Sequence, residues 1–206
     1  MHARSITIMG DPQKLDSGIE FVRDEVQPML TSMDGCIGMS MLVDRATGHC
    51  IVTSAWRDQE SMHASNAMLI DVRARGGEIM GGAPQVEEWE VGVMHRDHQA
   101  PEGSCCRVTW LQLEHGDVDR ALEAYRTQVL PRVEAMDGFC SASMLIDRVT
   151  GRACGTVAFE SQAACAASRE QATEVRAGAA SAAGASVTDV VEFELAIAQL
   201  RLPELV

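Results

Sequence analysis

The spacing of apolar residues predicts a strand and then a long amphipathic helix at the start of the chain. Residues 5–9 are rich in β-forming side chains, and Asp11-Pro12 is a typical helix start, with aspartate as the N-cap and proline in the first turn. Apolar side chains then recur every three or four residues, the period of one helix face: Leu15, Ile19, Val22, Val26, Met29/Leu30 and Met33. Gly35 follows where a helix-terminating glycine belongs, so we expect the helix to end near Met33.

The next residues predict a β-hairpin, a second helix and a last strand. Residues 36–43 and 49–56 form the two strands, joined by the turn 44–48, in which Gly48 supplies a positive φ. These strands do not alternate between apolar and polar residues, so both faces of their sheet are expected to be covered. With a helix over 58–75 and a strand over 86–94, the order is β-α-β-β-α-β, the ferredoxin-like unit.

The whole pattern occurs twice in constant register. The segments 33–35 and 41–48 return as 136–138 and 144–151, and Arg4, Trp56 and Val72 return as Arg107, Phe159 and Val175. Each copy has about a hundred residues, the size of one small domain. We therefore expect copy one over 1–94, a linker over 95–104, copy two over 105–198 and a C-terminal tail over 199–206. The predicted fold class is α+β, with tandem duplicated ferredoxin-like domains that form one intramolecular α+β barrel.

Both copies carry a shared motif that identifies a family. A proline stands near the end of the first helix, followed by Asp-Gly, a Met-Leu-Val/Ile-Asp-Arg-x-Thr-Gly hairpin, Ala-Trp/Phe and a polar helix start. This pattern resembles the antibiotic-biosynthesis-monooxygenase-like family of dimeric α/β barrels. The resemblance implies a barrel scaffold that hosts oxygenases, haem degraders, other enzymes and proteins without a known reaction. Single-domain members pair as homodimers, so the chain is expected to be a monomer with an internal pseudo-dimer, or a homodimer of such chains.

Composition and charge restrict the partners. The chain has 206 residues, 46% of them hydrophobic, and a formal net charge of -13 with a single lysine. Such a chain repels phosphate backbones, so nucleic acid and anionic membranes are excluded as partners. No apolar run has the length of a membrane span, and the seven cysteines do not follow the repeat, as a duplicated disulfide framework would. These features predict a cytoplasmic protein with cysteines that serve mainly as small core residues.

Five residues are candidates for a ligand pocket: Trp56, His63, Asn66, Trp110 and Tyr125. Trp56 ends a predicted strand, where it could stack on an aromatic ligand or pack in the core as its counterpart Phe159 does. The imidazole of His63 is the one candidate base, although copy two has Ala166 at that position and a surface histidine explains it as well. Because the copies differ at these sites, we expect an asymmetric cavity, lined by strands of copy one and by Trp110 and Tyr125.

No metal or cofactor is expected. His95 and His98 followed by Cys105-Cys106 have metal-binding residue types, but their spacing matches no zinc signature. The haem-degrading branch of the family places an Asn on the first strand and a Trp and a His later. This chain has Ile6-Thr7-Ile8 on that strand, and the Trp and His positions fall at or near Ser65 and near Arg75, so all three residues are missing. The Asp44-Arg45 and Asp147-Arg148 pairs are interpreted as turn caps and ion pairs.

The sequence leaves two classes of function open. One is a monooxygenase-type enzyme that acts on a hydrophobic aromatic small molecule, without a separate cofactor and not by the haem-degrading mechanism. The other is a non-catalytic ligand-binding or structural protein on a degenerate scaffold. The absent family residues favour the second, and a cavity lined by Trp56 would favour the first.

Overall fold

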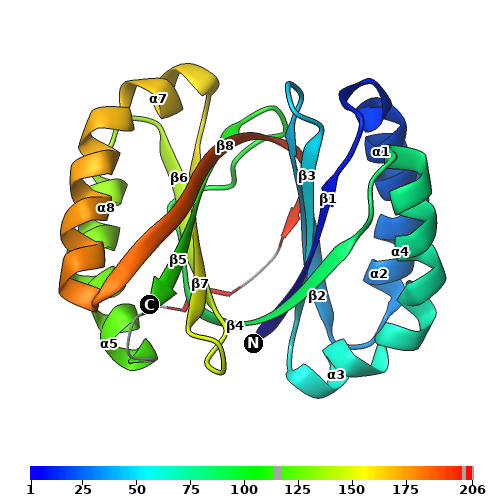
Figure 1. The fold of residues 1–206 in the computed structure, drawn as a ribbon, viewed down its shortest axis with the longest axis horizontal. Helices are drawn as coiled ribbons and strands as arrows, with labels where there is room; N and C mark the ends of the chain where they lie inside the picture. The colour runs from blue at the N-terminus through cyan, green and yellow to red at the C-terminus, as the bar shows by residue number, and fades with distance from the viewer. Residues whose placement is uncertain (114–116, 201–202, 206) are drawn as a thin grey trace. The chain divides into compact units, whose positions relative to one another are not determined.

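A computed structural model describes residues 1–113, 117–200 and 203–205 (Figure 1). Two compact units share the chain. The first contains residues Met1–Trp89 and the part of strand β8 (Ala185–Leu200) from Glu194, and the second contains Glu90–Phe193 and the residues from Pro203. Strands β4 (Gln85–Arg96) and β8 therefore contribute one segment to each unit. The sequence domains 1–94 and 105–198 each hold one repeat, and the compact units differ from them by the exchange of these segments.

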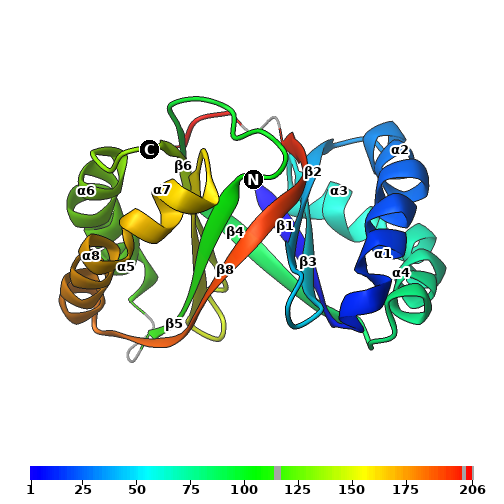
Figure 2. The same cartoon turned by 90° about the horizontal axis from the view of Figure 1, so that it is seen from above.

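The elements of the first copy follow the predicted order. The strands are β1 (His2–Met9), β2 (Cys36–Asp44), β3 (His49–Trp56) and β4 (Gln85–Arg96). The helices are η1 (Pro12–Lys14), α1 (Leu15–Phe21), η2 (Val22–Val26), α2 (Gln27–Ser32), α3 (Gln59–Ala64) and α4 (Asn66–Met80). In Figure 2, α1, α2 and α4 lie together on one face of β1, β2 and β3.

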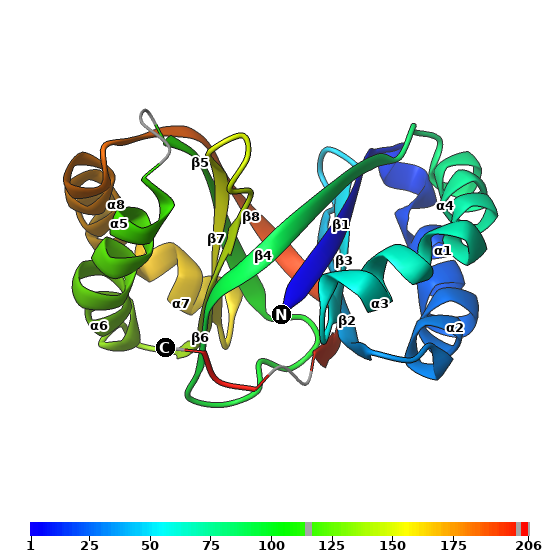
Figure 3. The same ribbon diagram turned by 90° about the horizontal axis from the view of Figure 1, so that it is seen from below.

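The second copy repeats these elements. Its strands are β5 (Cys105–Leu113), β6 (Phe139–Ile146), β7 (Arg152–Phe159) and β8 (Ala185–Leu200). Its helices are α5 (Val118–Ala124), η3 (Tyr125–Val129), α6 (Leu130–Glu134), α7 (Gln162–Ala167) and α8 (Arg169–Ala183). Figure 3 shows α5, α6 and α8 together on one side of this unit's strands.

The hydrogen-bonded strand order confirms the predicted fold class. The order is β1-β3-β2-β8-β5-β7-β6-β4, and it closes on β1 as an eight-stranded barrel. In both copies the first strand pairs with the third in the same register, with His2 opposite Trp56 and Cys105 opposite Phe159. Antiparallel pairing between β2 and β8 and between β4 and β6 joins strands of different copies. Residues far apart in the sequence thus complete each sheet.

The first helix of each copy contains a π-helical turn just before a proline. The N–H of Gln27 donates to Val22, and that of Leu130 donates to Tyr125, five residues back in each case. The following Pro28 or Pro131 has no N–H, so the ordinary helix ladder is interrupted there. Periodicity alone predicted one continuous helix, and the proline accounts for the difference.

Several local predictions are confirmed. The side chain of Asp11 accepts a hydrogen bond from the N–H of Gln13, and Gly35 and Gly48 both have φ of 76°.

Other segments differ from the prediction. The predicted second helix is divided at Ser65 and continues beyond Arg75 to Met80. The predicted tail 199–206 falls partly on residues 201, 202 and 206, which lie outside the described residues. Among the described helices, none is both long and apolar enough to cross a membrane.

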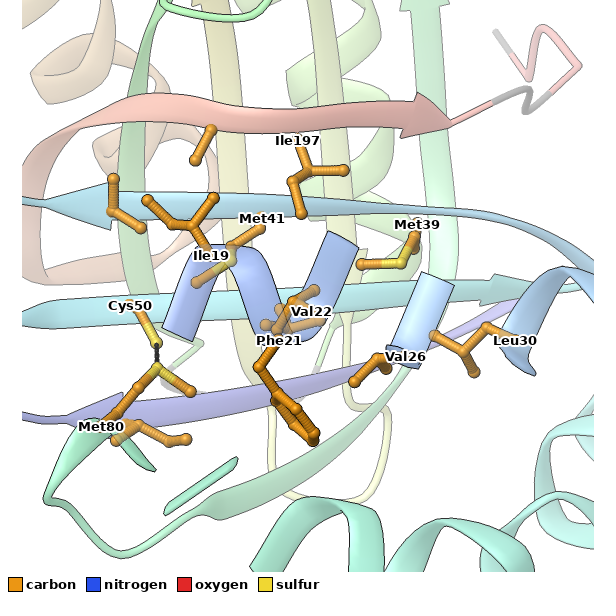
Figure 4. Close-up of a cluster of buried hydrophobic side chains, with 14 of the residues drawn as sticks. Ile19, Phe21, Val22, Val26, Leu30, Met39, Met41, Cys50, Met80 and Ile197 are labelled. Carbon is orange, nitrogen blue, oxygen red and sulfur yellow. Dashed lines mark hydrogen bonds between the residues drawn. The ribbon is translucent and has the colours of Figure 1, made fainter. Parts of the chain in front are cut away.

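The described core of the first unit forms one large cluster between helices and sheet, whereas the described residues of the second unit include two separate clusters. Figure 4 shows Phe21, Met41 and Met80 within the first core, where the Cys50 thiol contacts the Met80 sulfur at 3.4 Å. In the second unit, one cluster gathers around Phe139 and Phe159 and the other around Tyr125 and neighbouring side chains. The space between these two clusters is the candidate site.

Candidate functional site

An apolar cavity lies between the sheet and the helices of the second unit. It is lined by residues of β5, β6 and β7 on the sheet side and of α5, η3, α6 and α8 on the helix side. The lining is aliphatic except for Thr109, Tyr125 and two arginines, Arg107 and Arg176. All the described lining residues come from the second copy and lie within the second compact unit.

The space open within the cavity is small. About 90 Å³ is open to the centre of a water-sized sphere. For comparison, an apolar cavity of about 150 Å³ engineered into another protein takes up benzene and stays dry without it. The cavity here is smaller than that, so a flat ligand would place only part of a ring in it and would extend beyond it.

Small residues create this space where the first copy is filled. Three large side chains at equivalent helix positions become alanine: Phe21 corresponds to Ala124, Leu69 to Ala172 and Met80 to Ala183. In the first unit, Met80 packs so closely on Gly18 that an added Cβ would lie 2.6 Å from its side chain. Native interiors are close-packed, and voids larger than a water molecule are few. The alanines of α8 thus leave space at positions that large side chains fill in the first unit.

Tyr125 is the one aromatic group in the lining. It is the first residue of the π-turn η3, and its hydroxyl donates to the carbonyl of Ser143 at 3.2 Å. Burial raises the pKa of this phenol above its ordinary value, so the group stays protonated at neutral pH. A Cβ built on Gly155 would lie 3.6 Å from the Tyr125 ring, an ordinary contact. Tyr125 and Gly155 therefore lie side by side in the cavity lining.

The two arginines of the lining have different surroundings. Arg107 is buried and donates to Glu192, to the Ser168 hydroxyl at 2.9 Å and to the Cys165 carbonyl at 2.5 Å. Arg4 repeats this network in the first unit with Glu88, Ser65 and Met62. Because both copies keep the network, it serves the scaffold. Arg176 has no such network among the described residues.

The described residues contain one group with metal-binding potential. Donor atoms of Cys105, Cys165 and Glu192 lie within 4.8 Å of one another. A hydrogen bond between the two thiols raises the pKa of Cys105 and lowers that of Cys165. However, both oxygens of Glu192 already accept from arginines, Arg107 and Arg169. Two guanidinium groups oppose a cation at this point, so we interpret the group as part of the ion-pair network.

The two histidines with metal-binding residue types, His95 and His98, contact carboxylates. His95 contacts Glu134 and Glu204, both at 3.3 Å. His98 contacts Asp97 at 2.8 Å and Glu160 at 3.2 Å.

Of the five sequence candidates, only Tyr125 lines the cavity. Trp56 is fully buried in the core of the first unit, with its indole N–H donating to Ser54 at 3.0 Å. His63 is exposed and lies 2.8 Å from Glu88. Asn66 accepts from Arg73 on the surface of α4. These residues are not brought together around one space in the first unit.

Trp110 lies on β5 of the second unit. Its ring meets Phe193 edge-on, with centroids 6.3 Å apart. It is not part of the cavity lining.

The Asp-Arg pairs that both copies have in the hairpin turn form turn caps and ion pairs, as the sequence predicts. Asp44 accepts from the N–H of Ala46, and Arg45 pairs with Glu194 and Asp16. Asp147 and Arg148 repeat the arrangement, with Glu90 and Asp119 as the partners of Arg148.

Arg176 and the alanines of α8 are the site residues that sequence reasoning missed. Alanine side chains carry no chemistry by themselves, so the alanine-rich helix α8 did not suggest a site. The repeat contains a signal that could have found them. When the two copies are aligned, the copy with smaller side chains at equivalent core positions is the one in which a cavity is expected.

Comparison with known proteins gives the family. The sequence profile described as antibiotic biosynthesis monooxygenase matches residues 1–68. Two uncharacterised proteins of Mycobacterium tuberculosis (strain ATCC 25618 / H37Rv) are similar along the whole chain. Rv2557 is 49% identical over 206 residues, with 100% of this chain and 92% of the relative covered. Rv2558 is 48% identical over 207 residues, covering 100% and 88%.

Solved structures show the same fold at low sequence identity. An anthrone oxidase-like protein superposes with a TM-score of 0.69 and 16% identity, covering 96% of this chain and 92% of the other. A monooxygenase-like protein from Listeria innocua gives a TM-score of 0.54 and 10% identity, covering 95% and 94%. With the duplicated ferredoxin-like units and the closed strand order, these findings show that the chain belongs to the antibiotic biosynthesis monooxygenase family, as a member with two tandem copies of the domain.

Proposed function

We propose that the second unit binds a flat, apolar small molecule in its helix–sheet cavity and oxidises it in a monooxygenase-type reaction. The observation that carries the proposal is the asymmetry of the two copies. Alanine stands at three core positions of the second copy where the first has Phe21, Leu69 and Met80, and the cavity lies beside these alanines. An apolar pocket with a few polar groups is the usual form of a small-molecule site.

The lining limits the chemistry that such a site can perform. Among its described residues, no carboxylate, imidazole or thiol lines the cavity, so no general base stands ready there. His63, the base suggested by the sequence, lies in the first unit and pairs with Glu88. A reaction without a cofactor would therefore need a substrate that readily forms a stabilised carbanion, such as a methylene group beside a carbonyl and aromatic rings. The protein would contribute binding, orientation and exclusion of water.

Anthrone is a suitable first substrate to test, because one solved structure of this fold is described as anthrone oxidase-like. Its methylene carbon would lose two hydrogens and gain a carbonyl oxygen, and the second oxygen atom of O₂ would leave as water. This balance requires no reductant. Oxygen uptake and quinone formation above the uncatalysed rate support the enzyme, provided that Ala172→Leu removes the excess.

Binding without turnover is the second candidate, and the absence of a base among the described lining residues favours it. A neutral fluorescent probe, N-phenylnaphthylamine, separates the candidates. Probe binding that Ala172→Leu abolishes, without oxygen uptake on any flat substrate, identifies a binding protein. Probe fluorescence that is equal in wild type and Ala172→Leu contradicts a ligand site in this cavity.

A further inference from the structure

Arg176 places a positive charge at the apolar cavity without a described counter-ion. Its side chain is half-buried on α8, and its Nη2 donates to the Thr173 hydroxyl at 3.0 Å. Among the described residues, no carboxylate pairs with it. A guanidinium group has five N–H donors, so most of the hydrogen-bonding capacity of Arg176 is not used by described protein groups.

The equivalent residue of the first copy shows that this is not a requirement of the fold. Arg73 occupies the same position on α4 and donates to the Leu69 carbonyl at 2.9 Å and to both the carbonyl and the side chain of Asn66. The negative charge of Glu88 also stabilises the positive charge of the Arg73 guanidinium. In the second copy, Arg169 replaces Asn66 and binds Glu192, which leaves Arg176 with neither partner.

The local electrostatics make an anion favourable at Arg176. Burial lowers the pKa of its guanidinium, and the like charge of Arg107 lowers it further. Arg107 itself is committed to Glu192, Ser168 and the Cys165 carbonyl, so its charge is already compensated. The guanidinium of Arg176 has therefore lost part of its hydration, and no described carboxylate compensates its charge. An oxyanion within hydrogen-bond distance would supply that charge through short, charge-assisted bonds.

We infer that the cavity selects an aromatic anion, whose ring enters the apolar space and whose oxyanion pairs with Arg176. This inference rests on the proposed function, because it assigns a ligand class to the same cavity. The ligand class is a flat ring that bears a carboxylate, a sulfonate or an ionised enol or phenol. The chain carries a net charge of -13. A general preference for anions would therefore oppose its overall field, and the preference must be local.

A matched pair of fluorescent probes tests the inference. Anilinonaphthalene sulfonate and N-phenylnaphthylamine share their aromatic framework, and only the first carries a negative charge. Both are titrated into the full-length wild type, Arg176→Gln, Arg176→Lys and Ala172→Leu. Arg73→Gln is the control, since it removes the equivalent arginine of the first copy.

We expect Arg176→Gln to weaken the sulfonate about 10- to 100-fold, as the loss of a hydrogen-bonded charge does, and to change the neutral probe less than about twofold. Arg176→Lys should retain part of the preference, and Arg73→Gln should retain all of it. An equal effect of Arg176→Gln on both probes, or the same loss in Arg73→Gln, overturns the inference.

The same data keep the two proposals apart. If Ala172→Leu removes both probes and Arg176→Gln leaves their ratio unchanged, the cavity is the site and its charge selectivity is refuted. If Ala172→Leu affects neither probe, the proposed site itself is refuted.

Discussion

Filling the cavity with the residue of the first copy should stabilise the protein and abolish binding together. Ala172 is buried, lines the cavity and occupies the helix position at which the first copy has Leu69. Ala172→Leu adds three carbon atoms, which at about 0.8 kcal/mol per buried methylene contribute about 2.4 kcal/mol. Fixing the leucine rotamer costs about 0.5–1 kcal/mol. The net gain in unfolding free energy is therefore about 1.5–2 kcal/mol.

The gain is measurable by calorimetry and urea denaturation. For a chain of this length, about 2–4 °C of Tm accompanies each kcal/mol, so we expect a rise of about 3–8 °C. Binding of N-phenylnaphthylamine should fall in the same variant. Stabilisation with loss of binding is the signature of a cavity that is kept open for a ligand.

The reverse change in the first copy is the matched control. Leu69 is buried in the continuous core of the first unit, so Leu69→Ala leaves a new void and should cost about 2–5 kcal/mol. It should leave probe binding unchanged.

A second, smaller filling variant guards against overpacking in Ala172→Leu. A Cβ on Gly155 would meet Tyr125 and Met144 at 3.6 and 3.7 Å, ordinary contact distances. Gly155→Ala should therefore fit and weaken the probe without loss of stability. A lower Tm with undiminished probe binding in both Ala172→Leu and Gly155→Ala would refute the reasoning, because it would mean that no space exists there.

Further predictions concern the scaffold. Arg107→Met removes the buried donor to the Ser168 hydroxyl and the Cys165 carbonyl, whereas Glu192 keeps its bonds from Arg169. The change should cost about 1–3 kcal/mol in urea denaturation, and a wild-type stability curve would contradict this. The pKa of Glu192 is lowered to about 2, chiefly by its bond from Arg169, so the carboxylate contributes its full stability above its ordinary pKa of 4.5 and loses it as pH falls toward 2. Stability curves of wild type and Glu192→Gln should therefore converge as pH falls through that window; parallel curves would refute the pairing. Gly178→Ala, at an open position of α8, should add about 0.5–1 kcal/mol by calorimetry, and no gain would show that the helix is strained there. Gly48→Ala should destabilise the first hairpin, because φ is 76° and a Cβ would lie 2.2 Å from the Gly10 carbonyl oxygen; unchanged thermal unfolding would contradict this.

The sequence by itself determined the duplication, the element order and the family resemblance. These follow from local signals that survive in two diverged copies: the helix period from Leu15 onward, the cap at Asp11, and the glycines that close the turns. Such signals depend on a residue and its near neighbours, so a linear pattern contains them. The motif around Asp44 and Arg45 belongs to the same class, and its structural interpretation agrees with the contacts observed.

Only the tertiary structure decided where space remains and which charges are compensated. Trp56 and Tyr125 are both large aromatic side chains near strands or helices, yet one is sealed in a filled core and the other faces a cavity. Whether space remains beside an aromatic ring depends on the side chains that several separate helices and strands place around it, and on whether their combined volume fills that space. Arg73 and Arg176 likewise occupy equivalent positions, and their partners differ because residue 66 and residue 169 direct different groups toward them. Packing volume and charge balance are sums over the folded chain, and no local pattern contains them.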